Sequence, residues 1–275
     1  MVIVLVLMGP RTCLEITAAE KYLAFMKLAI ITGGSRGLGK SMSLRFAERG
    51  HDVILTYNRK KAEAGAMVAQ IETMGRKAVA LQLDVTDHKS LNAFANTVKG
   101  VLRENWQRND FDFLINNAGI GIHALFMETT EEQFDQLMSI HLKGPFFLTQ
   151  KLLPLMKDGG RIVNISSGLA RFSLPGYSAY AAMKGAVEVM TRYMAKELGA
   201  RRIAVNVVAP GAIETDFGGG AVRDNKQIND MIASGTALGR VGLPDDIGGA
   251  VAALLSEDCA WINGQRVEVS GGIFL

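Results

Sequence analysis

The stretch Lys27-Leu-Ala-Ile-Ile-Thr-Gly-Gly-Ser-Arg-Gly-Leu-Gly39, KLAIITGGSRGLG, decides the fold of this 275-residue chain. Its first half is a near-continuous apolar run, which is typical of a parallel strand covered on both faces. A glycine-rich turn follows at once and leads into a helical pattern. Such a turn lets the backbone approach a pyrophosphate, and the N–H groups at a helix N-terminus can bind it. The stretch therefore predicts a strand, a phosphate-binding turn and a helix.

Six further apolar runs alternate with amphipathic segments along the rest of the chain. We expect strands at 27–32, 52–57, 78–85, 111–119, 161–167, 203–210 and 265–272, and helices at about 37–50, 61–74, 88–105, 130–157, 178–200 and 244–256. Strands that alternate with helices through right-handed crossovers form a doubly wound sheet. Since no linker or repeat interrupts the pattern, we predict a single α/β domain over 26–275, with a parallel seven-stranded sheet flanked by helices.

Composition and charge argue against several classes of protein. The chain is 48% hydrophobic and 21% charged, and its formal net charge is +3 with acids and bases interspersed. This pattern indicates neither a nucleic-acid-binding nor a membrane-binding surface. Cys13 and Cys259 lie far apart in the sequence, which suits a reducing cytoplasm. The four histidines do not cluster, so we expect no metal site.

The first 25 residues are predicted to be an appendage of doubtful role. The apolar run VIVLVLM at 2–8 is too short to span a bilayer, which takes about 20 residues, and no basic segment precedes it as in a secretory signal. The buried-strand pattern starts at Met26. We therefore expect a chain beginning at Met26 to keep its activity and its melting temperature.

The segment after the second expected strand bears on the choice of dinucleotide. Ligands of doubly wound sheets bind beyond the carboxyl ends of the strands, and NAD usually requires an acid after the second strand. Here that strand ends in Tyr57-Asn58-Arg59-Lys60-Lys61, without an acid. Arg36 lies in the glycine turn, and a guanidinium can bind a 2′-phosphate bidentately. The sequence favours NADP(H) over NAD(H), although Lys60 and Lys61 also fit a solvated helix start.

Several motifs together give the chain a specific resemblance. They are TGGSRGLG at 32–39, Asp84-Val85, NNAG at 116–119, Ser167, YAAMK at 180–184 and PGAIET at 210–215. On these motifs residues 26–275 resemble the single-domain branch of the short-chain dehydrogenase/reductase family, of the 3-oxoacyl-carrier-protein reductase type. The resemblance implies a Rossmann-type fold and hydride transfer between a nicotinamide and a carbonyl or secondary alcohol.

The resemblance also implies which residues hold the cofactor. Asp84 and Val85 would hold the adenine, residues 117–119 would line the middle of the cofactor, and Ile213 and Thr215 would hold the nicotinamide carboxamide. The complete expected set is Gly33, Ser35, Arg36, Gly37, Leu38, Gly39, Asn58, Arg59, Asp84, Val85, Asn117, Ala118, Gly119, Tyr180, Lys184, Pro210, Gly211, Ile213 and Thr215.

The pair Tyr180 and Lys184 is the expected centre of the chemistry. Residues four apart lie on the same face of a helix, so a phenol and an ammonium stand side by side. The cation is expected to lower the pKa of Tyr180 from about 10, and Tyr180 then exchanges a proton with the substrate oxygen. Ser167, 13 residues earlier, matches the family's serine and would donate a hydrogen bond to that oxygen. Ser166 is the alternative serine, and a solvated helix face is the alternative for the pair taken alone.

One expected catalytic position departs from the family pattern. The family usually has asparagine where this chain has His141, and that asparagine holds a water that connects the lysine to solvent. An imidazole can also accept and donate, so a proton relay is one hypothesis, and it predicts an acidic limb in the pH–rate profile. A core histidine bonded to the backbone is the equally weighted alternative.

The segment after Thr215, DFGGGAVRDNKQINDMIASGTALGR, is predicted to form a mobile flap over the substrate. Apolar residues near it favour a mainly hydrophobic pocket for a small carbonyl or alcohol: Leu169, Phe172, Leu174, Pro175, Tyr177 and Phe217. The family generally forms tetramers or dimers, so a homo-oligomer is expected. The apolar residues Leu148, Val187, Met190 and Met194 are candidates for its interface.

Two other functions fit the same scaffold. A non-catalytic NADP(H)-binding sensor would need no proton donor, and the intact set of Ser167, Tyr180 and Lys184 argues against it. An epimerase or dehydratase would use the same Tyr–Lys pair, but members of that branch carry a separate substrate domain and a different glycine turn. We therefore expect an enzyme that acts on CH–OH donors or carbonyls.

Overall fold

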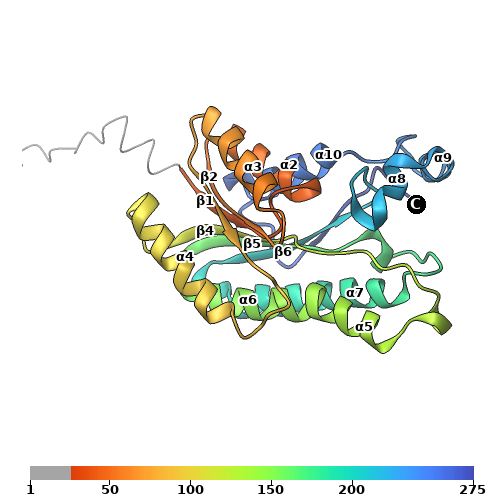
Figure 1. Cartoon of the computed structure of the whole chain (residues 1–275), viewed down its shortest axis with the longest axis horizontal. Helices are drawn as coiled ribbons and strands as arrows, with labels where there is room; N and C mark the ends of the chain where they lie inside the picture. The colour runs from red at the N-terminus through yellow and green to blue at the C-terminus, as the bar shows by residue number, and fades with distance from the viewer. Residues whose placement is uncertain (1–25) are drawn as a thin grey trace, which may run out of the picture.

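A parallel sheet forms the centre of the computed structural model, which describes residues 26–275 and leaves the expected appendage outside the described part (Figure 1). The strand order is β3-β2-β1-β4-β5-β6-β7, and each neighbouring pair is parallel. The strands are β1 (Leu28–Ile31), β2 (Asp52–Tyr57), β3 (Ala78–Gln82), β4 (Phe111–Asn116), β5 (Met156–Ile165), β6 (Ala204–Pro210) and β7 (Arg266–Val269). The predicted seven-stranded Rossmann-type sheet is confirmed.

Helices cover both faces of the sheet (Figure 1). One face carries α2 (Gly37–Glu48), α3 (Lys61–Thr73) and α10 (Pro244–Leu254), and the other carries α4 (Leu91–Trp106), α5 (Glu131–Met138), α6 (Gly144–Leu152) and α7 (Ser178–Glu197). In β1, Ala29 and Ile31 face the first layer, while Leu28 and Ile30 face the second. Because both faces of the strand are buried, its sequence reads as a continuous apolar run.

The helix expected over 130–157 is not continuous. Thr130 and Gln133 form a capping box that starts α5, and a π-helical turn at Ser139–Lys143 then separates α5 from α6. A short 3-10 turn at Leu153–Leu155 leads into β5. The π-turn contains His141, and turns of this kind are frequent at functional sites.

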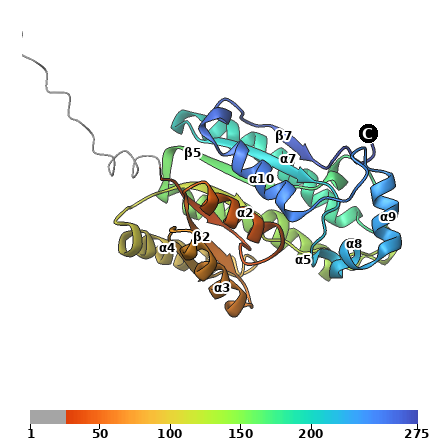
Figure 2. The same cartoon turned by 90° about the horizontal axis from the view of Figure 1, so that it is seen from above.

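The segment predicted as a flap contains helices. A 3-10 turn at Phe217–Gly220 leads to α8 (Ala221–Asp224) and α9 (Lys226–Ser234), and both helices lie at the same end of the molecule as the C-terminus (Figure 2). The side chain of Asn225 accepts hydrogen bonds from two N–H groups in the first turn of α9. This cap explains why a polar sequence becomes helical here.

The residues proposed for an oligomer interface are largely core residues. Leu148, Val187 and Met190 are buried within the chain itself, so they are not available to a partner. The exposed apolar side chains on the same helices are Phe146, Val189 and Tyr193. Among residues 26–275, none of the helices has the length and hydropathy needed to cross a bilayer.

Candidate active site

The glycine turn between β1 and α2 has the shape that the sequence predicts. A Cβ atom at Gly39 would clash with the carbonyl oxygen of Gly33, so the turn requires glycine at this position. The Asn117 side chain donates hydrogen bonds to the carbonyl oxygens of Thr32 (2.9 Å) and Gly33 (3.3 Å) and holds the turn against the end of β4. No side chain caps α2, and its first turn has no acid. The helix start therefore suits an anionic pyrophosphate.

Asp84, Asn58 and Arg59 come together at the carboxyl ends of β2 and β3. The pKa of Asp84 is lowered mainly by hydrogen bonds from the hydroxyl and the N–H of Thr86. A hydrogen bond with Asn58 and the positive charge of Arg59 lower it further. The Asp84 side chain is thus an ionised acceptor. Val85 is half-buried beside it and packs against the core.

The segment after β6 lies against the glycine turn. Gly211 N–H donates to the carbonyl of Val269, and Ile213 forms a bridge with Gly242. Thr215 is 3.8 Å from the position that a Cβ on Gly37 would take. The expected cofactor residues of the PGAIET motif are therefore brought to the same edge of the sheet as the turn, next to Arg36, whose guanidinium is 3.8 Å from Asp216.

Tyr180 and Lys184 both point into the protein from α7. They are 6% and 5% exposed, and the Lys184 ammonium lies 5.5 Å from the centre of the Tyr180 ring. Lys184 Nζ donates to the carbonyl oxygen of Ile165 at 2.8 Å. Ser167 shares a hydrogen bond with Tyr180, and its Oγ also accepts from the N–H of Leu169 at 3.2 Å. The three predicted side chains converge at the carboxyl end of β5.

The protonation of this pair differs from the prediction. Burial raises the pKa of Tyr180 above its usual 10, and the hydrogen bond with Ser167 only partly opposes this. Burial also lowers the pKa of Lys184 to about 7. The expected lowering of the Tyr180 pKa by Lys184 is therefore absent, because the low-dielectric surroundings penalise both charged forms. Tyr180 is a neutral phenol at neutral pH.

His141 contacts both Tyr180 and the loop after β4. Its ring stands at 89° to the Tyr180 ring with centroids 5.1 Å apart, and its Nε2 is 2.8 Å from the carbonyl oxygen of Ile120. Burial, and then the charge of Lys184, lower the pKa of His141 to about 2. A pKa this low argues against the titration that the relay hypothesis requires, and it agrees with the alternative of a core histidine bonded to the backbone. Its Nδ1 is buried and has no protein partner among the described residues.

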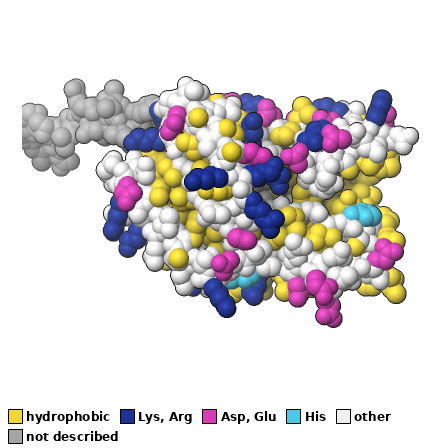
Figure 3. All heavy atoms as spheres, viewed as in Figure 1, with side chains coloured by type: hydrophobic (Ala, Val, Ile, Leu, Met, Phe, Trp, Pro, Cys, Tyr) yellow, Lys and Arg dark blue, Asp and Glu magenta, His cyan; other side chains and the backbone are white. Residues whose placement is uncertain are grey.

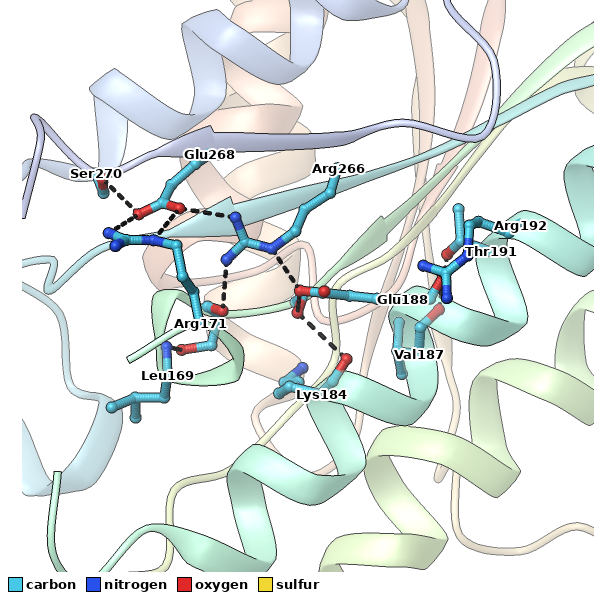
Figure 4. Close-up of polar contacts among 12 residues, drawn as sticks. Leu169, Arg171, Lys184, Val187, Glu188, Thr191, Arg192, Arg266, Glu268 and Ser270 are labelled. Carbon is cyan, nitrogen blue, oxygen red and sulfur yellow. Dashed lines mark hydrogen bonds and ion pairs between the residues drawn. The ribbon is translucent and has the colours of Figure 1, made fainter. Parts of the chain in front are cut away.

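Ion pairs connect Arg266 on β7 with Glu188 on α7 and with Glu268, which also pairs with Arg171 (Figure 4). The hydrogen bonds around this network distinguish the two serines. Ser166 Oγ donates to Glu188 on α7 at 2.7 Å, so Ser166 has a structural partner and Ser167 faces Tyr180. Arg266 on β7 donates to the same carboxylate at 2.7 Å and to the backbone carbonyl of Ser167 at 3.4 Å. Sequence reasoning missed Glu188 and Arg266, although Glu188 stands four residues after Lys184.

The network continues to the C-terminal segment. Although burial of Glu268 opposes its ionisation, hydrogen bonds from Arg171, Arg266 and Ser270 lower the pKa of Glu268 to about 2. Arg171 also donates to the backbone carbonyls of Ile273 and Phe274. The C-terminal segment is therefore tied to the loop that follows Ser167.

Apolar side chains surround the open side of Tyr180. A narrow crevice beside Tyr180, with no room for a water molecule, is lined by Ile122, Ala124, Thr129, Leu137, Gly176 and Ala179. Leu169 packs beside Tyr180 and Phe217 contacts its ring, as the sequence predicts, whereas Phe172 is turned toward Phe274. Figure 3 shows hydrophobic side chains gathered at the end of the molecule where α8 and α9 approach α5.

The protein has the features of an NAD(P)-dependent oxidoreductase. They are a doubly wound sheet, a glycine turn that leads into a helix without a side-chain cap, and a buried tyrosine beside a lysine. Residues 33–273 match the family model described as enoyl-(acyl carrier protein) reductase. The chain belongs to the short-chain dehydrogenase/reductase family, as the motifs predict.

Curated relatives and solved structures agree with this assignment. The chain is 35% identical over 258 residues to the tetrahydroxynaphthalene reductase PfmaG of Pestalotiopsis fici, covering 90% of this chain and 91% of that protein. It is 37% identical to the structure of the promiscuous reductase LugOII, which catalyses keto-reduction at C1 during lugdunomycin biosynthesis, with a TM-score of 0.86 over 90% of this chain and 98% of that one. The landomycin C-6 ketoreductase LanV, solved with NADP and rabelomycin, is 34% identical with a TM-score of 0.82 over 90% and 96% of the two chains.

Proposed function

We propose that this enzyme reduces a ketone with NADPH, and that Tyr180 gives the proton to the carbonyl oxygen. The convergence of Ser167, Tyr180 and Lys184 at the end of β5, with Tyr180 held as a neutral phenol, is the observation that carries the proposal. A neutral phenol is the form that a proton donor needs. NADPH, when bound, supplies the hydride.

The three side chains have separate proposed roles. As charge develops on the substrate oxygen, Ser167 donates a hydrogen bond to it and Tyr180 transfers its proton. Lys184, with a pKa of about 7, is partly charged at neutral pH and stabilises the phenolate that remains. We also assign it a hydrogen bond to the nicotinamide ribose.

His141 is proposed as a positioning residue and not as a titrating relay. It stays neutral and binds the carbonyl of Ile120, which keeps the loop after β4 in place beside Tyr180. Its unpartnered Nδ1 suits a bound water, which would supply the missing hydrogen bond.

The proposed cofactor is NADP(H), preferred over NAD(H). Arg36 is more than half exposed at the glycine turn, and Arg59 follows β2 where an NAD-binding enzyme usually has an acid. Asp84 and Val85 are assigned to the adenine, Asn117–Gly119 to the middle of the cofactor, and the 210–215 segment to the nicotinamide. NADP is present in the LanV structure, and NADPH in that of a 37% identical blue fluorescent protein, which supports the choice.

The proposed substrates are flat, ring-containing ketones. The narrow crevice at Tyr180 is lined mainly by small and aliphatic side chains, and Phe217 packs against the Tyr180 ring. Such walls favour an apolar ring system. The names of the relatives, a tetrahydroxynaphthalene reductase and an angucycline C-6 ketoreductase, point to the same class.

The enzyme is also proposed to be a homo-oligomer. Exposed apolar side chains on neighbouring helices, Phe146 on α6 with Val189 and Tyr193 on α7, form surface suited to a second copy. Light scattering during gel filtration tests this. Location in the cytoplasm stays a prediction.

Oxidation of NADPH over a panel of naphthol-type ketones, simple ketones and oxoacyl thioesters tests the proposed activity. Tyr180→Phe should reduce turnover by about 10²–10⁴ while the NADPH Kd changes little. Full turnover by this variant would remove Tyr180 from the mechanism. Binding of NADPH without turnover on any substrate would favour a sensor instead.

A further inference from the structure

Phe217 packs against the ring of Tyr180, with the two ring planes tilted by 58°. The two ring centroids are 5.7 Å apart, and Phe217 is 43% exposed on its other side. Gly121 makes this position possible, because a Cβ there would lie 2.7 Å from the Phe217 ring. A ring-shaped substrate that approaches Tyr180 therefore meets Phe217 first.

The preceding residue, Asp216, bonds to the cofactor end of the site. Its carboxylate lies 3.8 Å from the Arg36 guanidinium in the glycine turn and 2.5 Å from that of Arg223 on α8. After Phe217, three successive glycines, residues 218–220, all have left-handed backbone angles. Glycine adopts these angles without steric cost, so the segment has a hinge next to the two contacts.

We propose that Asp216 and Phe217 together couple the 2′-phosphate site at Arg36 to the opening of the substrate crevice at Tyr180. When a 2′-phosphate binds Arg36, the guanidinium leaves Asp216, and the released segment moves Phe217 off the ring of Tyr180. The inference rests on the proposed use of NADP(H).

The charges favour a change of partner for Arg36, from the Asp216 carboxylate to the 2′-phosphate. An ion pair between two half-exposed side chains is weak, whereas a phosphate monoester carries about two negative charges and can bind a guanidinium through two hydrogen bonds. Asp216 keeps its shorter ion pair with Arg223 when Arg36 leaves, so its carboxylate is never left without a cation. The cofactor phosphate therefore draws the Arg36 guanidinium away from Asp216, and the 216–224 segment loses little stability.

Phe217→Trp turns the contact into a fluorescent reporter. Adenosine 2′,5′-bisphosphate is the probe, adenosine 5′-monophosphate is its control, and calorimetry follows binding of each. Wild type corrects for the emission of Trp106 and Trp261. We expect a red shift in emission at position 217 with the bisphosphate, as the indole moves into water, and none with the monophosphate.

A second variant tests the charge competition. Asp216→Asn should tighten binding of the bisphosphate about two- to five-fold, since it removes the competing carboxylate. Asp224→Asn, which removes the other partner of Arg223 but no contact with Arg36, should leave the affinity unchanged. Binding with no change in emission, or equal affinities in wild type and Asp216→Asn, overturns the coupling. Calorimetry that shows no bisphosphate binding would instead refute the proposed NADP(H) preference, and the coupling with it.

Discussion

The imidazole of His141 stands at a right angle to the ring of Tyr180, with the two centroids 5.1 Å apart. Both rings are buried, and the ammonium of Lys184 lies 5.5 Å from the centre of the Tyr180 ring. The site therefore places three titratable groups in surroundings that favour the neutral form of each. Their pH behaviour follows from that shared environment more than from their mutual charges.

The first prediction concerns the acidic side of the pH–rate profile. Because the pKa of His141 is about 2, its charge does not change between pH 5 and 8. Wild type and His141→Asn should therefore show the same pH dependence of kcat/KM over this range, even if the rates differ. A limb near pH 6.5 that disappears in the variant would restore the proton-relay hypothesis.

The same residue should make stability sensitive to acid. The folded pKa of His141 lies below its unfolded value of about 6.5, so the unfolded chain binds more protons below that pH. Above pH 6.5 His141 does not reduce the free energy of unfolding. Below this pH the free energy of unfolding falls by about 1.4 kcal/mol for each pH unit. Urea unfolding at pH 7.5 and 5.5 should show a smaller loss for His141→Asn than for wild type.

Lys184 gives a prediction on the alkaline side. Its folded pKa of about 7 lies below the unfolded value of about 10.4, so the unfolded state binds more protons between these values and stability rises with pH there. Lys184→Met removes this dependence. Relative to wild type, the free energy of unfolding of the variant should increase most at pH 6 to 7 and least near pH 10. Equal gains at both ends, from urea unfolding of the cofactor-free protein, would contradict the buried-ammonium assignment.

The two adjacent serines form a matched pair. Ser167→Ala removes the donor beside Tyr180 and should lower kcat by about 10²–10³ with little change in melting temperature. Ser166→Ala removes the bond to Glu188 and should cost about 1–2 kcal/mol of stability while turnover stays within a few-fold of wild type. Reversal of these two effects would make Ser166 the catalytic serine.

Glu268 should contribute to acid sensitivity at lower pH. Its folded pKa of about 2 lies below the usual value for glutamate. Glu268 therefore stabilises the folded protein fully above about pH 4.3, and this stabilisation is lost as the pH falls through 2. Between pH 5 and 2.5, Glu268→Gln should lose less stability than wild type. Glu63→Gln, which breaks an exposed pair on α3, is the control and should behave like wild type.

The sequence predicts local features of this protein well. The apolar run of β1 and the glycines of the turn depend on neighbours within a few residues, and the four-residue spacing places Tyr180 and Lys184 on one face. The partners of Ser166 and Ser167 were harder to predict. Arg266 reaches Ser167 across 99 residues of sequence, and they come together only because β5 pairs with β6 and β6 with β7.

The lowering of the Tyr180 pKa was predicted wrongly for a physical reason. Spacing shows that Lys184 stands near Tyr180, but it does not show how completely the core excludes water from both. Desolvation depends on the whole packed structure, and here it outweighs the attraction between the two groups. The ion pair of Arg36 with Asp216 was missed for a similar reason, because it depends on how the 216–224 segment folds back on the glycine turn.

The π-turn at Ser139–Lys143 allows one helical segment to pack against two different helices. Its wider winding changes the direction in which side chains project, so α5 before it packs on α7 while α6 after it packs on α4. An uninterrupted α-helix would carry one orientation through both halves. Removing a single residue from this turn should therefore misalign the active site and the helix layer at once, although every contact residue remains in the chain.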